Sequence, residues 1–143
     1  MKTYTIKEIS ELFQMPSSTL RYYEEIGLLT NVSRTSSGQR IYQECHINRL
    51  KTLCCFKRTG MTISQLLTFF DYEEKETEHI DDILSLLTNQ KQTTWEQLVK
   101  LQSDYQHIQR KLSYFSDIKT AKETHTSMPQ WKDYRNRTYD IFK

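Results

Sequence analysis

The residues with the clearest chemical potential form one short segment, Leu20 to Leu29, with the sequence LRYYEEIGLL. It contains an arginine and two tyrosines, and the hydroxyl-bearing residues Ser18 and Thr19 stand directly before it. An arginine can bond two atoms of a guanine edge or of a phosphate at once, and hydroxyl groups bond phosphate oxygens. At the front of a short helix, these side chains suit contact with the backbone and base edges of DNA. The alternative is a small amphipathic helix whose tyrosines are half buried.

Two short helices joined by a turn are predicted around this segment. Thr5 and Glu8 have the spacing of a capping box, and apolar residues then recur at helical intervals through residues 6–13. A second helix is predicted to begin near residues 17–18 and to end at Gly27, which can adopt the left-handed conformation of a helix end. This pair predicts a helix-turn-helix, in which the second helix reads DNA.

Residues 28–43 lack the helical spacing of apolar residues, and their pattern predicts a β-hairpin. Two short extended pieces flank a Ser- and Gly-rich turn over residues 35–39, and Arg34 and Arg40 stand on either side of that turn. A hairpin that carries arginines beside a helix-turn-helix is a wing, placed to bind phosphates. The alternative is a solvated loop, since loops also carry arginines.

Two further helices are predicted after the hairpin. The first covers residues 44–59, and the second opens at a capping-box pattern that begins at Thr62. The turn between them follows Arg58 and could contact the DNA backbone as a second wing.

The most regular pattern lies in residues 80–118, where positions spaced alternately by four and three residues are mostly apolar. The apolar and aromatic members of this seam are Leu84, Leu87, Leu98, Leu101, Tyr105, Ile108, Leu112 and Phe115, together with Ile80. The pattern predicts one long coiled-coil helix, whose simplest partner is the same helix of a second subunit. Packing of this helix on residues 1–72 of its own chain is the alternative.

Composition limits the class of protein and the cellular location that the sequence allows. The chain has 143 residues, only three Gly and two Pro, and a mean hydropathy of -0.74, which together favour a polar, helix-rich protein. No apolar run approaches the ~20 residues of a membrane span, and no signal-peptide core is present. The three cysteines do not form a disulfide framework, so a cytoplasmic location is predicted. The histidines and cysteines lack the spacing of metal ligands, and neither a metal site nor a cofactor is predicted.

The predicted fold is therefore mainly α: a winged helix-turn-helix domain followed by a long antiparallel coiled-coil dimerisation helix. The first domain covers residues 1–72, which carry nine Lys and Arg against six Asp and Glu. An acidic linker over 73–79 leads to the dimerisation helix at 80–118, and residues 119–143 form a short basic and aromatic tail. The aromatic residues of the tail are Trp131, Tyr134, Tyr139 and Phe142.

The segment Leu20 to Leu29, followed by GQRIY at residues 38–42, resembles the MerR family of bacterial transcription regulators. The resemblance extends over about residues 4–118. It implies a homodimer that pairs through antiparallel long helices and binds an inverted repeat in promoter DNA. It also implies that the protein bends and untwists a promoter with an overlong spacer, so that RNA polymerase can use both promoter elements.

The same resemblance implies DNA contacts from the reading helix, the hairpin and the turn before the fourth helix. The implied residues are Ser18, Thr19, Arg21, Tyr22, Tyr23, Arg34, Arg40, Tyr42, Arg58 and Thr62. Arg21 and Tyr22 would contact base edges or phosphate, and Tyr23 would support them. Tyr42 would hold phosphate together with the two hairpin arginines.

Cys55 is a candidate thiol sensor. Lys51 precedes it by four residues and Arg58 follows it by three, so both cations share its helix face and favour the reactive thiolate. Its position resembles that of the single cysteine in the aldehyde-responsive, AdhR- and NmlR-like branch of the family. The adjacent Cys54 departs from that pattern and falls on the core face.

Two other functional classes stay open. One is a regulator that binds a small molecule in an aromatic pocket at the end of the dimer, built from Trp95, Tyr105, Trp131 or other aromatic residues, although the sequence identifies no effector. The other is an architectural DNA-binding protein without a regulatory role. An enzyme is disfavoured because the sequence shows no nucleophile–base pair, paired carboxylates or glycine-rich phosphate loop.

Overall fold

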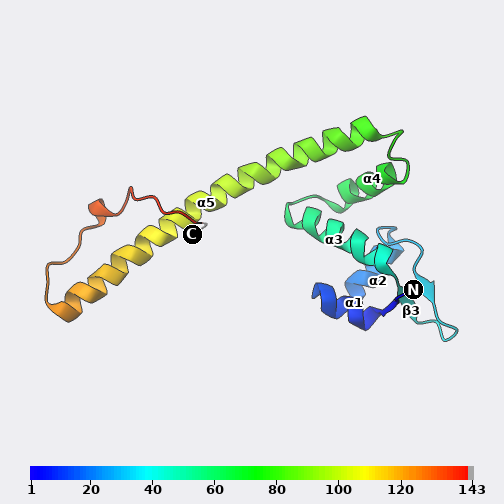
Figure 1. The fold of residues 1–143 in the computed structure, drawn as a ribbon, viewed down its shortest axis with the longest axis horizontal. Coiled ribbons are helices and arrows are strands. Elements are labelled where there is room, and N and C mark those ends of the chain that lie inside the picture. Colours follow the sequence, from blue (N-terminus) through cyan, green and yellow to red (C-terminus); the bar gives the residue numbers. More distant parts are fainter. Residues whose placement is uncertain (142–143) are drawn as a thin grey trace. The chain divides into compact units, whose positions relative to one another are not determined.

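The computed structural model describes residues 1–141 of the chain (Figure 1). The chain divides into two compact units, Met1–Gln90 and Lys91–Lys143. Phe142, which the sequence assigned to the aromatic tail, lies outside the described residues. None of the helices within residues 1–141 is both long and apolar enough to cross a membrane.

The predicted order of helices and hairpin is confirmed. In chain order the elements are β1 (Tyr4–Thr5), α1 (Ile6–Phe13), α2 (Ser17–Glu25), β2 (Ser33–Arg34), β3 (Arg40–Tyr42), α3 (Glu44–Arg58), α4 (Ile63–Glu74), α5 (Ile80–Thr124) and the 3-10 turn η1 (Trp131–Asp133). The predicted starts of the first four helices agree closely with these, and α1 and α4 each start at a predicted capping box.

Hydrogen bonds at the helix ends explain these boundaries. The Glu8 backbone N–H donates to Thr5 Oγ1 over 3.1 Å, and the Thr5 N–H donates to Glu8 Oε1 over 3.1 Å, which completes the predicted capping box of α1. Gly27 ends α2 with a φ of +87°, a conformation that favours glycine. The chain turns there, and the Leu28 N–H returns to the Tyr23 carbonyl over 2.8 Å.

The hairpin belongs to a three-stranded antiparallel sheet of order β1-β3-β2. In this sheet Tyr4 pairs with Tyr42, and Arg34 pairs with Arg40. The two-residue strand β1 lacks a sequence signal of its own and was not predicted. It ties the root of the hairpin to the start of α1.

One hydrophobic core holds the first unit together. Its buried members come from α1 to α4 and the connecting segments: Ile9, Leu20, Tyr23, Leu28, Leu29, Tyr42, Ile47, Leu50, Leu53, Met61, Leu66, Phe69 and Phe70. The first turns of α5 also pack against this core through Ile83, Leu86 and Leu87. Leu87, which the sequence placed in the seam, therefore contacts its own domain.

Two helix boundaries in the second half differ from the sequence-based ones. α4 continues to Glu74, so the segment between helices begins later than the predicted linker at residue 73. Glutamate is a good helix former, and the acidic residues do not interrupt the helix. α5 continues past residue 118 to Thr124, and Ala121 is buried there.

In the second unit, the tail folds back along α5 (Figure 1). The Tyr134 hydroxyl donates to Asp117 Oδ2 over 2.5 Å, and the Tyr114 ring contacts the rings of Trp131 and Tyr134 with centroid distances of 5.5 and 5.3 Å. The buried Gln106 side chain bonds both the N–H and the carbonyl of Tyr139. These contacts order a tail whose role the sequence did not predict.

Candidate nucleic-acid interface

Helix α2 separates a core face from a solvent face. Leu20 and Tyr23 are buried, whereas Ser18, Arg21 and Tyr22 are exposed. Thr19 is half-buried at the edge between the two faces. The helix therefore presents a guanidinium, a phenol and a hydroxyl on one surface.

Tyr23 has a supporting position beneath this surface. Its ring is 2% exposed, and its hydroxyl accepts a hydrogen bond from Lys57 Nζ over 2.9 Å. This bond is the main cause that raises the pKa of Lys57. Tyr23 thus ties α2 to the end of α3, through a lysine that the sequence analysis had not singled out.

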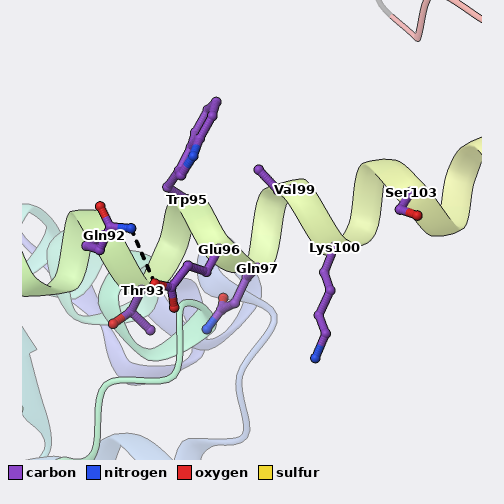
Figure 2. Close-up of a pocket in the computed structure, with 8 residues that line it drawn as sticks. All are labelled: Gln92, Thr93, Trp95, Glu96, Gln97, Val99, Lys100 and Ser103. Atoms are coloured by element: carbon purple, nitrogen blue, oxygen red, sulfur yellow. Dashed lines mark hydrogen bonds between the residues drawn. The ribbon is translucent and has the colours of Figure 1, made fainter.

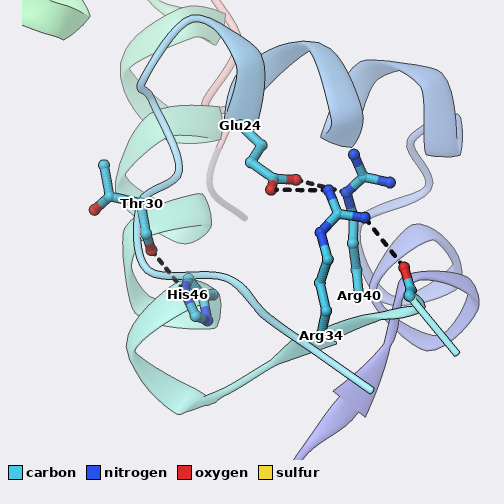
Figure 3. Close-up of polar contacts among 6 residues, drawn as sticks. Glu24, Thr30, Arg34, Arg40 and His46 are labelled. Atoms are coloured by element: carbon cyan, nitrogen blue, oxygen red, sulfur yellow. Dashed lines mark hydrogen bonds and ion pairs between the residues drawn. The ribbon is translucent and has the colours of Figure 1, made fainter. Parts of the chain in front are cut away.

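The two hairpin arginines are held by an acidic residue of α2. Glu24 Oε2 lies 2.5 Å from Arg40 Nε, and Glu24 Oε1 lies 3.5 Å from Arg34 Nη2 (Figure 3). Arg34 Nη1 also donates to the Gly38 carbonyl over 3.1 Å. The hydrogen bond with Glu24 is the largest cause that raises the pKa of Arg40 above its usual value. Glu24 was not predicted as part of this surface, although its charge is opposite to that of the hairpin arginines.

Three of the predicted basic contacts come together. Arg21, Arg34 and Arg40 line one open cleft with Glu24 and Glu25. Because α2 and the hairpin are both tied to the same core, this cleft joins the predicted reading helix and the predicted wing on one surface.

Tyr42 does not belong to that surface. Its side chain is 0% exposed, burial raises its pKa, and its ring meets His46 edge-on with centroids 5.8 Å apart. Its hydroxyl has no hydrogen-bond partner within residues 1–141. Tyr42 lies where β3 pairs with β1 and directly before α3, so core elements surround it. A phosphate contact by this side chain is contradicted by its burial.

The turn between α3 and α4 is the predicted second wing. Arg58 is exposed at the end of α3. Thr62 is exposed as well, but its hydroxyl accepts from the Gln65 N–H over 3.1 Å and lies 3.2 Å from Gln65 Oε1. Within residues 1–141 Arg58 forms no ion pair, whereas the Thr62 hydroxyl caps α4.

The cysteines occupy different environments. Cys55 is exposed on α3, and Cys45 is exposed at its start. Cys54 is partly buried against the core, and this burial raises the pKa of its thiol. No group of three or more His, Cys, Asp or Glu side chains in the described part of the chain could hold a metal ion.

The predicted seam is a row of exposed apolar side chains on α5. Leu84, Leu98, Leu101, Tyr105, Ile108, Leu112 and Phe115 are between 47% and 67% exposed. Successive residues of an α-helix are rotated by about 100° around its axis. The positions that the tail covers, including Gln106 and Asp117, therefore lie on the side of α5 opposite to this row. The tail therefore leaves the seam uncovered over the residues that the structure describes, 119–141.

The aromatic residues considered for a small-molecule pocket do not gather. Trp95 lines an open groove with Val99 and other residues of the same stretch of α5 (Figure 2). Trp131 instead packs on Tyr114, and Tyr105 belongs to the seam. A pocket shared by Trp95, Tyr105 and Trp131 is therefore not formed within the described part of this single chain.

Comparisons with known proteins agree with this architecture. Residues 4–73 match the family described as MerR HTH family regulatory protein. An HTH-type transcriptional regulator of Haemophilus influenzae is 30% identical over 117 residues, which cover 82% of this chain and 87% of that protein. The regulator AdhR of Bacillus subtilis is 32% identical over 83 residues, or 56% of this chain and 59% of AdhR.

A solved structure extends the similarity to most of the chain. The protein in that solved structure is HiNmlR, which is described as a MerR family regulator lacking the sensor domain, bound to promoter DNA. It superposes with a TM-score of 0.75 at 29% identity and covers 87% of this chain and 92% of its own.

Proposed function

This chain belongs to the MerR family of DNA-binding transcription regulators, and on that premise we propose that it binds an inverted repeat in promoter DNA as a homodimer. The observation that carries the proposal is the cleft in which Arg21 of α2 meets Arg34 and Arg40 of the hairpin. Phosphate contacts from the hairpin fix the position of a protein on DNA, and side chains of the inserted helix read the base edges.

The proposed DNA contacts follow from the placement of each side chain. Arg21 and Tyr22, on the exposed face of α2, would reach base edges or adjacent phosphates, and Ser18 and Thr19 would add backbone contacts. The hairpin arginines and Arg58 would bind phosphates on either side. Tyr23 supports α2 from the core, and the buried Tyr42 is left out.

The proposed dimer forms through the seam of α5. An isolated helix that exposes a heptad row of leucines and aromatics is not stable in water, and a second copy of the same row would bury it. A two-fold axis between antiparallel helices would place two DNA-binding units on two half-sites of a palindrome. Distortion of the intervening promoter DNA would then allow RNA polymerase to use it, which is the proposed mode of control.

The experiment that tests this function is footprinting on the promoter next to the protein's own gene, combined with affinity measurements on unrelated duplexes of equal length. We expect protection of an inverted repeat and at least about 10³-fold tighter binding than to unrelated DNA. Equal affinity for all duplexes would favour the architectural alternative and contradict a promoter-specific regulator.

We further propose that Cys55 senses electrophiles such as aldehydes. Cys55 is exposed. Burial raises the pKa of Cys54 above that of an ordinary thiol, so less of Cys54 is thiolate at neutral pH than of an ordinary cysteine. Since the thiolate is the nucleophile, alkylation is expected to reach Cys55 before Cys54. The similarity to AdhR and the neighbouring Lys51 and Arg58 support this role.

A Cys55→Ser variant is expected to bind promoter DNA like the wild-type protein but to lose its transcriptional response to aldehyde in cells. Adduct formation can switch transcription only if it affects two conformations differently, so the cellular response is the decisive measurement. Cys45→Ser, which removes another exposed thiol of α3, is the matched control and should keep the response. A normal response from the Cys55 variant would leave Cys55 without a sensing role.

A further inference from the structure

Two positive charges face each other across the hairpin, and one acidic residue of α2 contacts both. Arg34 and Arg40 are directly paired across β2 and β3, and like charges in such a pair destabilise a hairpin. Glu24 of α2 contacts both guanidiniums, each through a different carboxylate oxygen (Figure 3). The carboxylate is thus the counter-charge for both arginines.

We propose that Glu24 is a positioning residue that holds the hairpin against α2 and sets the orientation in which Arg34 and Arg40 meet DNA. The proposal rests on the proposed function, because it takes DNA phosphates as the groups that the two arginines bind. Glu24 itself would not contact DNA, since a carboxylate repels phosphate.

The geometry of the ion pairs indicates that Glu24 orients the arginine side chains and does more than neutralise their charge. The Glu24 side chain is 22% exposed and the Arg40 side chain 20% exposed, so this pair is partly shielded from water. Glu24 bonds Arg40 through Nε. The two terminal amino groups of Arg40 have no hydrogen-bond partner within residues 1–141, and their donors remain available for a phosphate. Glu24 therefore orients the Arg40 fork without occupying its outer end.

The hairpin needs such an external contact because its own ladder is short. β2 has two residues and β3 has three, and a two-stranded hairpin of this size is at best marginally stable alone. Pairing with β1 holds the root of β3, at Tyr42 and Ile41. The contacts of Glu24 lie nearer the tip, where Arg34 and Gly38 are linked to each other.

Loss of the carboxylate charge should have two opposite effects on DNA binding. Removing a negative charge next to the cleft raises attraction to any DNA, because it reduces repulsion of phosphates. Releasing the two arginines from a fixed position lowers the additional affinity for the specific site, because that affinity depends on correctly placed contacts. Glu24→Gln should therefore raise affinity for unrelated DNA and lower the ratio of specific to non-specific affinity.

Glu25→Gln is the matched control. Glu25 is the next residue of α2, lines the same cleft and is exposed, but within residues 1–141 it forms no ion pair with the hairpin arginines. The two variants carry the same change in net charge. Glu25→Gln should raise both affinities together and leave their ratio unchanged, whereas Glu24→Gln should lower the ratio about tenfold, the size of one charge-assisted hydrogen bond.

The probes are a duplex with the promoter next to the protein's own gene and a scrambled duplex of the same length, titrated with each variant at one fixed salt concentration. Equal ratios for the two variants would overturn the positioning role of Glu24. If the wild-type protein itself fails to distinguish the two duplexes, the proposed function fails instead.

Hydrogen exchange of the free protein gives a second readout that needs no DNA. The Thr35 N–H donates to the Gln39 carbonyl over 2.8 Å and the Gly38 N–H to the Thr35 carbonyl over 2.9 Å, which closes the hairpin tip. Glu24→Gln should speed exchange of these two amides severalfold, while Glu25→Gln should leave their exchange unchanged. The amides of the α1 core should exchange at the wild-type rate in both variants. Unchanged exchange at the tip in Glu24→Gln would also overturn the proposal, and unchanged core exchange confirms that the variant is folded.

Discussion

A Leu101→Asp variant is expected to be a monomer at concentrations where the wild-type protein is a dimer. Leu101 is 66% exposed near the middle of the seam, so in the proposed dimer its side chain would be buried against the second helix. Burial of an unpaired carboxylate costs several kcal/mol, and about 3 kcal/mol already weakens association more than 100-fold. Sedimentation velocity over a range of concentrations measures this change directly.

Val99→Asp is the control for this experiment. Val99 is also an exposed apolar residue of α5, at 47% exposure, but it lies in the groove with Trp95 rather than in the seam. It is offset from Leu101 by about 200° around the helix, so the same new charge would face solvent. The Val99 variant should remain a dimer. A dimeric Leu101 variant, or a monomeric Val99 variant, would show that the seam has been assigned to the wrong face.

Loss of the dimer should also remove specific DNA binding. One DNA-binding unit can contact only one half-site, whereas a linked pair gains the second contact at a high effective concentration. The Leu101 variant should therefore keep weak, salt-sensitive binding to any duplex and lose the footprint over an inverted repeat. Hydrogen exchange of the core amides of α1 should not change, since Leu101 lies outside the unit Met1–Gln90.

Local signals account for the success of the sequence analysis over the first unit. The capping box at Thr5, the glycine at Gly27 and the second capping box at Thr62 each involve residues within a few positions of one another. Such signals act before tertiary packing and can be read from one segment at a time. They predicted the start or end of α1, α2 and α4.

Contacts between distant segments could not be predicted in the same way. The sequence shows that Glu24 has a charge opposite to that of Arg40, but only the fold brings the two side chains to 2.5 Å. Tyr42 is the last residue of the strand that carries Arg40 and was expected to hold phosphate, yet pairing with β1 places it in the core. Both cases depend on which elements pack together, and a periodic pattern does not contain that information.

The seam shows the same limit within one helix. The heptad pattern of Leu84 and Leu87 is uniform in the sequence, but Leu84 is 55% exposed whereas Leu87 packs partly against the core of its own domain. A partner helix and an intramolecular core demand the same apolar residue type. The pattern therefore predicts that the side chain is covered without predicting what covers it.

An Arg21→Ala variant is expected to lose 1–3 kcal/mol of binding free energy on its promoter site, or roughly five- to 150-fold in affinity, if the side chain reads a base. Arg21 is exposed on α2 and lines the cleft, and within residues 1–141 it forms no ion pair such as those that hold Arg34 and Arg40. Folding should be unaffected, because an exposed side chain without such contacts contributes little to stability.

Salt dependence separates base reading from phosphate binding in this variant. If Arg21 reads a base, affinity for the promoter duplex should fall while affinity for a scrambled duplex changes little and the promoter salt slope stays nearly constant. Arg40→Ala provides the contrasting pattern: affinity for both duplexes should fall, and the slope of log K against log salt should flatten by about one. An Arg21 variant that behaves like the Arg40 variant would assign Arg21 to the phosphate backbone. One that matches the wild type on both duplexes would show that the exposed face of α2 does not read the DNA, because Arg21 has the longest base-reading side chain on that face.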